Sequence, residues 1–236
     1  MRRLRRAAAA LCAALLLTSC ANDGSYGNEI SVDEFETDYS TVYAETIAFS
    51  GLENREYESE LNESVAADVA AAVAEFDTLA LEAAETLPAG VKSTFRITQN
   101  VKRSSGGFIS FIEEHYIYVG GAHGNTSWYP RTIYALSESP HPLALSELFS
   151  EPDYRDRLNI LIERAVTEDP ERYSELWEKP ELTEENENNY YLTDTDLVIF
   201  FPPYTLSYYA KGFIEFNIKL TEIEGMIKDE YKFEKR

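Results

Sequence analysis

Cysteine is nearly absent from this 236-residue sequence. Its two cysteines, Cys12 and Cys20, both lie within the first 20 residues. The rest of the chain therefore has no thiol, which excludes disulfides, thiolate catalysis and zinc–thiolate sites there. A domain without such cross-links is held by packing, and an aromatic content of 13% is sufficient for that.

Motifs for catalysis and metal binding are also missing. The three histidines, His115, His123 and His141, form neither an HExxH motif nor a pair at positions i and i+4, so a standard zinc site is not expected. The glycines at 120 and 121 lack the spacing of a phosphate-binding loop, and no GxSxG elbow is present. We predict no metal, no cofactor and no catalytic residues.

Basic residues are scarce. Lysine and arginine number 21 against 42 aspartates and glutamates, which gives a formal net charge of −21. This balance excludes a nucleic acid partner, because a polyanion requires a basic surface. A cationic partner would be attracted. Many exported acidic proteins simply remain soluble through their charge, so the charge by itself assigns no partner.

Long hydrophobic runs are limited to one segment, from Ala7 to Leu17. This run follows a basic start and is too short to span a membrane, which is typical of a secretory signal. The adjoining Leu-Thr-Ser-Cys at 17–20 resembles the lipobox of bacterial lipoproteins. That resemblance implies removal of a signal peptide at 1–19 and acylation of Cys20 by palmitate-type chains, which attach a protein to a membrane. The alternative is an ordinary signal peptide with a chance cysteine.

We therefore expect a lipid-anchored protein of the cell envelope. Ala21, not aspartate, follows the modified cysteine, so the usual sorting rule implies the outer membrane, facing the periplasm, if the organism has two membranes. The leader carries four arginines, and the mature chain would have a charge near −25.

In the first half, the small polar residues of 20–33 predict a flexible tether. Thr37–Phe49 is rich in β-branched and aromatic residues and predicts a strand. Further strands are expected over 95–101, 108–119 and 129–136. Apolar residues at helical spacing predict a long helix that ends before Pro88: Leu61, Val65, Val69, Val73, Phe76, Ala80, Ala83 and Leu87.

In the second half, helices and strands cluster instead of alternating. The expected elements are a helical turn at 146–149, a helix from 153 to 165, a short helix after Pro170, a hairpin of 190–193 with 197–201, a strand over 214–220, and a short helix opened by a capping box at 221–224. The order predicts an α+β fold with a mainly antiparallel sheet. This sheet packs against the long N-terminal helix and a shorter C-terminal helical segment.

Two clusters are candidate binding sites. The first contains Gly120, Gly121 and His123, where glycines permit close backbone approach and a histidine could bind or polarise a ligand. The structural alternative is that His123 fixes a tight turn by contacting the backbone. The second cluster is an aromatic segment stiffened by two prolines, with candidate residues Tyr204, Tyr208 and Tyr209. Its alternative is that these rings close over the core.

Four stretches, in this order, resemble a known family: Ile47–Leu52 with Leu61-Asn62, Tyr118–Asn125, Leu143–Phe149, and Leu197–Tyr204 through Tyr209–Gly212. They are similar to the paired extracytoplasmic domains in the non-catalytic part of the peptidoglycan deacetylase PdaC. The same pair forms the outer, lysozyme-sensing part of the sigma-V anti-sigma factor. The resemblance implies an N-terminal PdaC-like domain over 34–144 and a C-terminal lysozyme-sensor-like domain over 145–236.

The resemblance implies binding without catalysis. The deacetylase's activity lies in a separate metal-dependent domain, whose His-x-x-x-His motif this chain lacks, and anti-sigma action needs a cytoplasmic segment and a spanning helix. Our leading hypothesis is a membrane-anchored binding module for lysozyme, another cationic protein or peptidoglycan. The first alternative is a cell-wall glycan hydrolase or deacetylase-like enzyme that uses His123. The second is a structural envelope lipoprotein.

Overall fold

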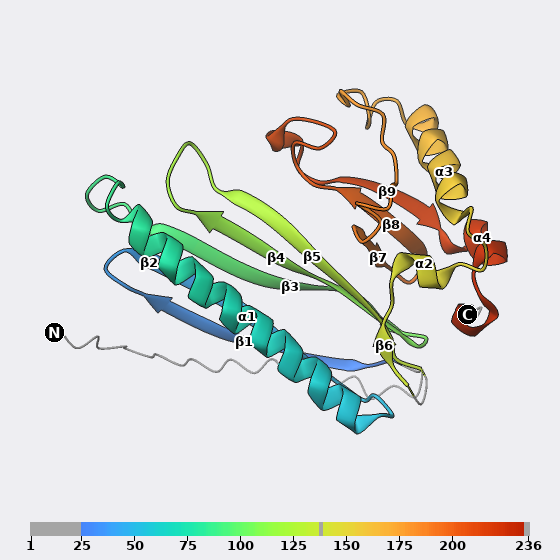
Figure 1. Ribbon diagram of the computed structural model, residues 1–236, viewed down its shortest axis with the longest axis horizontal. Coiled ribbons are helices and arrows are strands. Elements are labelled where there is room, and N and C mark those ends of the chain that lie inside the picture. Colours follow the sequence, from blue (N-terminus) through green and yellow to red (C-terminus); the bar gives the residue numbers. More distant parts are fainter. Residues whose placement is uncertain (1–24, 137–138, 234–236) are drawn as a thin grey trace. The chain divides into compact units, whose positions relative to one another are not determined.

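The computed structural model describes residues 25–136 and 139–233 (Figure 1). The predicted signal peptide at 1–19, Cys20 and the start of the predicted tether lie outside these residues. The chain divides into two compact units. Among the described residues, unit 1 comprises 25–100 and 113–128, and unit 2 comprises 101–112, 129–136 and 139–233.

Unit 1 contains two long strands and one long helix in full, together with parts of three further strands. Strand β1 (Gly27–Glu36) pairs antiparallel with β2 (Ser40–Ser50), and β2 pairs in parallel with the first part of β3 (Ser93–Ser105). A parallel pair needs a long crossover, and α1 (Arg55–Ala83) supplies it. The predicted strand at 37–49 and the predicted long helix are both confirmed.

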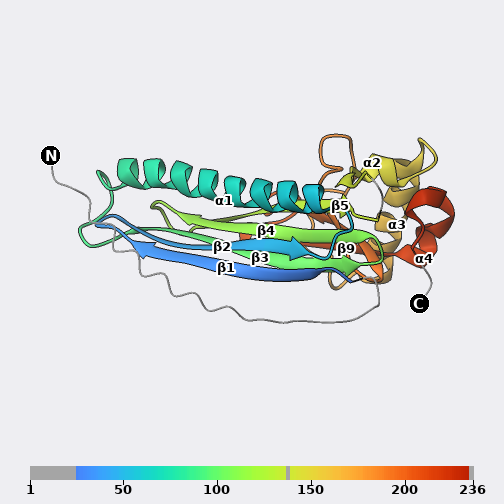
Figure 2. The same ribbon diagram turned by 90° about the horizontal axis from the view of Figure 1, so that it is seen from below.

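Helix α1 lies along one face of the strands of unit 1 (Figure 2). Its apolar stripe meets every second residue of β2 and β3, as expected from the helical period and the strand period. The rings of Phe76 and Phe95 stack with centroids 4.9 Å apart. The buried residues of this core are Val42, Ala44, Val69, Phe76, Ala80, Phe95 and Ile97.

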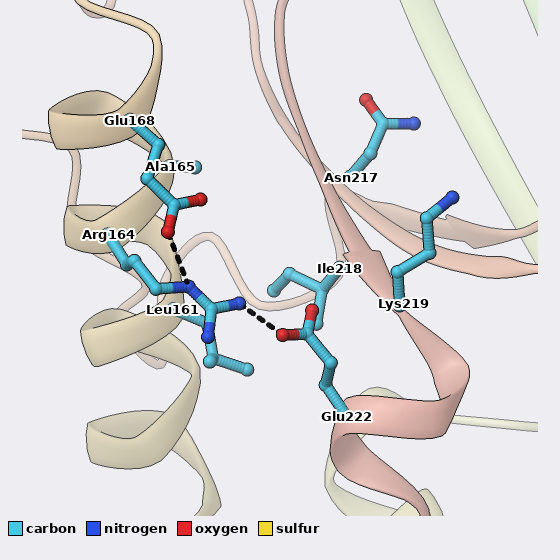
Figure 3. Close-up of a pocket in the computed structure, with 8 residues that line it drawn as sticks. All are labelled: Leu161, Arg164, Ala165, Glu168, Asn217, Ile218, Lys219 and Glu222. Atoms are coloured by element: carbon cyan, nitrogen blue, oxygen red, sulfur yellow. Dashed lines mark hydrogen bonds and ion pairs between the residues drawn. The ribbon is translucent and has the colours of Figure 1, made fainter.

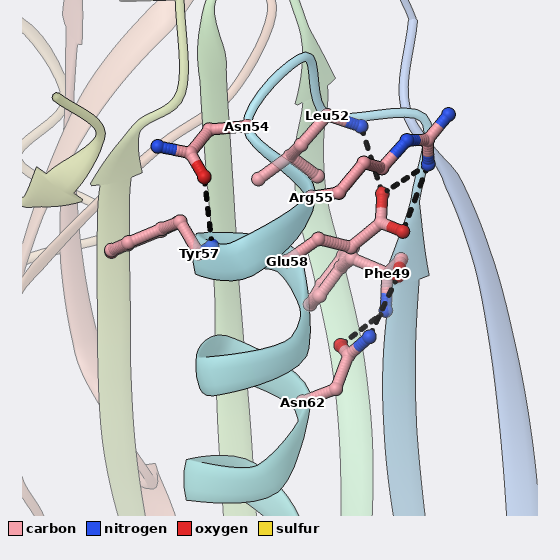
Figure 4. Close-up of polar contacts among 7 residues, drawn as sticks. All are labelled: Phe49, Leu52, Asn54, Arg55, Tyr57, Glu58 and Asn62. Carbon is pink, nitrogen blue, oxygen red and sulfur yellow. Dashed lines mark hydrogen bonds and ion pairs between the residues drawn. The ribbon is translucent and has the colours of Figure 1, made fainter. Parts of the chain in front are cut away.

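Polar side chains fix the start of α1 against β2 (Figure 4). Asn54 caps the helix by accepting a hydrogen bond from the backbone N–H of Tyr57 at 3.0 Å. About two turns after the cap, the Asn62 amide accepts from the N–H of Phe49 at 2.8 Å and donates to its carbonyl at 2.9 Å. Helix and strand are therefore held by apolar packing and by this two-way amide contact.

Unit 2 contains a second, smaller sheet. Strands β7 (Tyr190–Leu192), β8 (Asp196–Phe201) and β9 (Ile214–Lys219) pair antiparallel in that order, which confirms the predicted hairpin and the predicted last strand. Helix α3 (Tyr154–Glu168) buries Leu158 and Ile162 in the same core as the sheet. The shorter elements are α2 (Leu145–Leu148), η1 (Tyr209–Lys211), α4 (Leu220–Ile223), η2 (Glu224–Met226) and η3 (Asp229–Tyr231).

The long strands β3, β4 (Phe108–Tyr118) and β5 (Asn125–Tyr134) contribute residues to both units. Together with β1, β2 and β6 (His141–Pro142), they form a six-stranded sheet in the order β1-β2-β3-β4-β5-β6. The pairs β1–β2, β5–β6, β7–β8 and β8–β9 are antiparallel, and β2–β3 is parallel. The predicted α+β class with mainly antiparallel sheets is therefore confirmed.

Three local predictions are wrong. Gly27–Val32 is not a flexible tether but most of β1, paired residue by residue with β2. The segment after Pro170 forms turns, not a helix, because a contact with a distant loop holds its backbone. Helix α4 begins at Leu220 with Lys219 as its N-cap, so the capping box at 221–224 does not open it.

No helix in the described part of the chain is long and apolar enough to cross a membrane.

Candidate functional site

The tyrosine-rich segment that follows β8 is an ordered loop of unit 2. Thr205 donates its N–H to the carbonyl of Pro202 at 3.1 Å, which closes a β-turn with Pro203 and Tyr204 at its centre. A turn with proline at its second position and positive φ at its third has the type II pattern. The third position normally takes glycine or asparagine, but here it holds a tyrosine with φ of 68°.

Tyr204 is the single non-glycine residue with positive φ in residues 25–136 and 139–233. A left-handed backbone places Cβ too close to the following carbonyl oxygen, so this conformation is unfavourable for a tyrosine. Its side chain is not taken into the core, because Tyr204 is 57% exposed. The ring lies 5.5 Å from that of Tyr209, centroid to centroid. Backbone strain is thus maintained beside an outward-facing ring.

A second segment, 173–179, is hydrogen-bonded to this loop. The backbone N–H of Trp177 donates to the carbonyl of Leu206 at 3.0 Å, and its indole N–H donates to the carbonyl of Thr205 at 3.3 Å. The Ser207 hydroxyl donates to the carbonyl of Glu175 at 2.8 Å. These bonds bring Trp177 to the tyrosines although it lies 25 or more residues earlier in the chain. Sequence reasoning missed Trp177 as a site residue.

The two hydrogen-bonded segments carry three exposed rings, Trp177, Tyr204 and Tyr208, and the half-buried Tyr209, and we call this part of unit 2 the aromatic surface. Trp177 is 54% exposed and Tyr208 is 42% exposed. Monomeric proteins seldom expose several large rings together unless the patch serves an interaction. The structure therefore brings the predicted residues Tyr204, Tyr208 and Tyr209 to one place. The alternative that the rings of this segment close over the core holds for Phe200 and Phe201, which are buried, whereas Tyr209 is half-buried and Tyr204 and Tyr208 are exposed.

Glu175 binds two neighbouring side chains beside the aromatic surface. Its carboxylate accepts a hydrogen bond from the Tyr208 hydroxyl at 2.8 Å and pairs with the Lys211 ammonium at 2.5 Å. The hydrogen bond from Lys211, followed by that from Tyr208, lowers the pKa of Glu175. The same carboxylate raises the pKa of Lys211 and the pKa of Tyr208. Glu175 and Lys211 are therefore both charged at neutral pH.

The chain around the aromatic surface is acidic. Within residues 168–187, basic side chains are limited to Arg172 and Lys179. The nine carboxylates of that stretch are Glu168, Asp169, Glu171, Glu175, Glu178, Glu181, Glu184, Glu185 and Glu187. A field of this sign attracts cationic groups towards the aromatic surface.

The loop with the other predicted site residues lies in unit 1, between β4 and β5. Gly120 and Gly121 have φ of 115° and 94°, so both positions use conformations that favour glycine. The Nδ1 atom of His123 lies 2.8 Å from the carbonyl oxygen of Gly124. This contact agrees with a turn-fixing role for His123, while a binding role for the loop stays a prediction.

A pocket of about 390 Å3 lies between α3 and β9 in unit 2 (Figure 3). Arg164 crosses it and forms ion pairs with Glu168, at 3.7 Å, and with Glu222. Lys219, at the pocket rim, pairs with Asp196 at 2.8 Å. These charges are already matched, so the pocket favours no charged ligand. Among residues 25–136 and 139–233, no group of three or more His, Cys, Asp or Glu side chains is placed to hold a metal ion.

Comparisons with known proteins find one family match in the first part of the chain and another in the second. Residues 34–126 match the family described as deacetylase PdaC, and residues 146–221 match DUF3298, described as a protein of unknown function. A search of curated proteins gives no significant match.

Two solved structures share the fold. A DUF3298 family member from Bacteroides fragilis has a TM-score of 0.67 at 16% identity, covering 89% of this chain and 96% of its own. A DUF3298 family protein from Pseudomonas aeruginosa PAO1 has a TM-score of 0.61 at 15% identity, covering 91% of this chain and 99% of its own. At such identities the likeness concerns the fold alone.

Proposed function

We propose that this chain, which combines a PdaC-type region with a DUF3298 region, is a non-catalytic binding protein of the cell envelope. Its partner is a cationic protein, such as lysozyme, and the aromatic surface of unit 2 is where that partner binds. The observation that carries this proposal is the strained, exposed Tyr204 among three further rings. Strain of this kind persists where the surrounding structure enforces it, commonly at ligand sites.

The residue types of the aromatic surface support protein binding. Trp and Tyr are enriched among the residues that contribute most to protein–protein affinity, because each buries a large area and loses few rotamers. Their ring faces also attract lysine and arginine side chains through cation–π interactions. An exposed Trp177 beside Tyr204 and Tyr208 therefore suits a partner with basic side chains.

The charge of the whole chain supports a cationic partner in particular. A formal net charge of −21 steers a basic protein towards the chain and raises the association rate, most strongly at low salt. The acidic stretch 168–187, which contains Trp177, concentrates this attraction in the sequence around the aromatic surface. Acyl chains at Cys20 would hold the protein on the envelope, where a secreted cationic protein arrives.

Calorimetric titration of the purified protein with lysozyme tests the proposal. We expect binding whose affinity falls between low and moderate salt, and at least about tenfold weaker binding for Trp177→Ala and Tyr204→Ala. Tyr129→Ala is the matched control, because Tyr129 is 49% exposed but lies outside the aromatic surface. Absence of heat at both salt concentrations rejects lysozyme as the partner. An equal loss with Tyr129→Ala rejects the aromatic surface as the site.

The enzymatic alternative has one observation in its favour. The stretch matching the family described as deacetylase PdaC, 34–126, includes His123. An activity on cell-wall glycan that His123→Ala abolishes, with the unfolding midpoint unchanged, would establish the enzyme and displace the binding proposal. We expect the purified protein to release neither sugar nor acetate from peptidoglycan.

A further inference from the structure

A second pocket, of about 690 Å3, lies in unit 1 on the C-terminal part of β1, on β2 and on β3. The strand register places Glu34 beside Tyr43, and Tyr43 beside Arg96, so these three residues form one row across three strands. In the next row, Thr41 stands beside Thr94. We call the pocket surface defined by these five residues and Thr98 the cross-strand groove.

The cross-strand groove lies on the face of the sheet opposite α1. Val42 and Phe95, whose neighbours in sequence are the groove residues, are buried in the core with α1. Successive side chains of a strand point to opposite faces, so Tyr43 and Arg96 point away from the helix. Figure 2 shows α1 on the other face of β1, β2 and β3.

The two ends of the row carry opposite charges that have no partner within the described residues. The side chain of Arg96 is exposed and makes no hydrogen bond or ion pair with residues 25–136 or 139–233, and the same holds for the side chain of Glu34. The third charge of the pocket is different, because Glu36 pairs with the Lys92 ammonium at 2.6 Å. The groove therefore offers one open cation and one open anion.

Between and beside these charges the groove offers hydroxyl groups, with Tyr43 in the same row and Thr41 and Thr94 in the next. Thr41 donates its hydroxyl hydrogen to the Thr94 hydroxyl oxygen at 3.2 Å, which leaves the Thr94 hydrogen available beside Arg96. Tyr43 donates to the Glu45 carboxylate at 2.8 Å, so its hydroxyl oxygen remains an acceptor. Thr94 and Thr98 flank Arg96 on the same strand face, where they can add donors to a carboxylate held by the guanidinium.

From this arrangement we propose that the cross-strand groove binds a short peptide that has both a free ammonium and a free carboxylate. The carboxylate lies on Arg96, and the ammonium lies on Glu34 and the face of Tyr43. Neighbouring strands are about 4.8 Å apart, so Glu34 and Arg96, on the first and third strands, are about 10 Å apart. An extended residue spans about 3.5 Å, and a peptide of about three residues covers that distance.

A ligand of a single charge fits the groove less well. A simple carboxylate would meet the open Glu34, and a simple amine would meet the open Arg96, so each would be repelled at one end. A zwitterion of matching length satisfies both groups. This site is separate from the aromatic surface, and its occupation does not depend on capture of a cationic protein.

Titration of the purified protein with trialanine, followed by calorimetry or NMR, tests the proposal. We expect saturable binding, weakened at least about tenfold when the peptide is N-acetylated or C-amidated, because each change removes one charged contact. Arg96→Gln should weaken trialanine binding by a similar factor. Arg157→Gln is the matched control, because it removes the same charge from an exposed position in unit 2.

The Glu34→Gln variant gives a second, independent measurement. It should weaken binding of trialanine but not that of N-acetyl-trialanine, which has no ammonium to lose and whose single negative charge Glu34 repels. Both groove substitutions alter exposed side chains, so the unfolding midpoint should stay the same. The proposal is overturned if trialanine shows no saturable binding up to about 20 mM. Equal binding of the blocked peptides, or equal weakening by Arg157→Gln, also overturns it.

Discussion

Tyr204 holds a backbone conformation that a bulky side chain seldom adopts, with φ of 68°. Replacing it with glycine removes this strain, whereas replacing it with alanine keeps the strain and removes only the ring. We therefore expect Tyr204→Gly to be more stable than Tyr204→Ala by about 1 kcal/mol in urea unfolding. Equal stability of the two variants would show that the surrounding loop does not strain this position.

The two substitutions of Tyr204 should differ in stability but not in their effect on lysozyme binding. Both substitutions remove the ring from the aromatic surface, so both should weaken binding alike. A surface maintained for interaction at some expense of stability would behave in this way.

Asn62 shows how one side chain can replace missing backbone hydrogen bonds. Its amide contacts both the N–H and the carbonyl of Phe49, at 2.8 and 2.9 Å. Asn62→Ala removes both of these hydrogen bonds from a buried strand residue, and we expect the free energy of unfolding to fall by about 2 kcal/mol.

Asn62→Asp is the informative companion variant. A carboxylate can still accept from the Phe49 N–H but cannot donate to the Phe49 carbonyl, so this variant should lose less than Asn62→Ala. Urea unfolding monitored by circular dichroism measures both. No loss with Asn62→Ala would mean that water replaces the amide without cost.

At the scale of elements, the sequence predicts those helices and strands that bury one face, because their apolar residues then recur at a regular spacing. Helix α1 and strand β9 each expose one face and bury the other, so their patterns are evident in the sequence. Strand β1 has no such pattern, because it lies at the edge of the sheet with eight of its ten residues exposed. Its glycine, asparagine and acidic residues are therefore typical of both an edge strand and a linker.

The candidate site was partly predictable for a related reason. Three tyrosines close together after two prolines indicate a stiff aromatic loop, and the structure places them on one surface. Trp177 joins them through hydrogen bonds from its indole N–H to the carbonyl of Thr205 and from its backbone N–H to the carbonyl of Leu206, and no local sequence pattern indicates a contact over 28 residues. The same contact explains why the segment after Pro170 is not helical.

At the scale of the whole molecule, buried tyrosines make stability depend on alkaline pH. Burial, followed by a hydrogen bond to Glu187, raises the pKa of Tyr154 from 10.0 to about 12. Burial also raises the pKa of Tyr190 and of Tyr191. These phenols ionise more readily in the unfolded chain, so their contribution to stability is complete below pH 10 and declines as the pH rises towards 12 and beyond.

Urea unfolding at pH 8, 10 and 11 measures this decline. Tyr154→Phe lacks the ionising group and should show a shallower fall in the free energy of unfolding above pH 10 than the parent chain. Parallel curves for the two proteins would show that Tyr154 ionises equally in the folded and unfolded states.

The proposed membrane attachment would be a property of the whole molecule that depends on one residue, Cys20. We expect the parent chain to incorporate labelled palmitate and to sediment with the membrane fraction, because several acyl chains give lasting attachment. Cys20→Ala should incorporate no label and leave the membrane fraction. Mass spectrometry that finds an intact, unacylated segment before residue 20 in the parent chain would contradict the lipoprotein assignment.

The most direct test of the central proposal is hydrogen–deuterium exchange of the protein with and without lysozyme. We predict that lysozyme slows exchange in two segments separated in the sequence, 173–179 and 202–213, because these carry the aromatic surface. Loop 119–124 of unit 1 should exchange at the same rate in both samples. Protection confined to unit 1, or unchanged exchange in both aromatic segments at saturating lysozyme, would contradict the account.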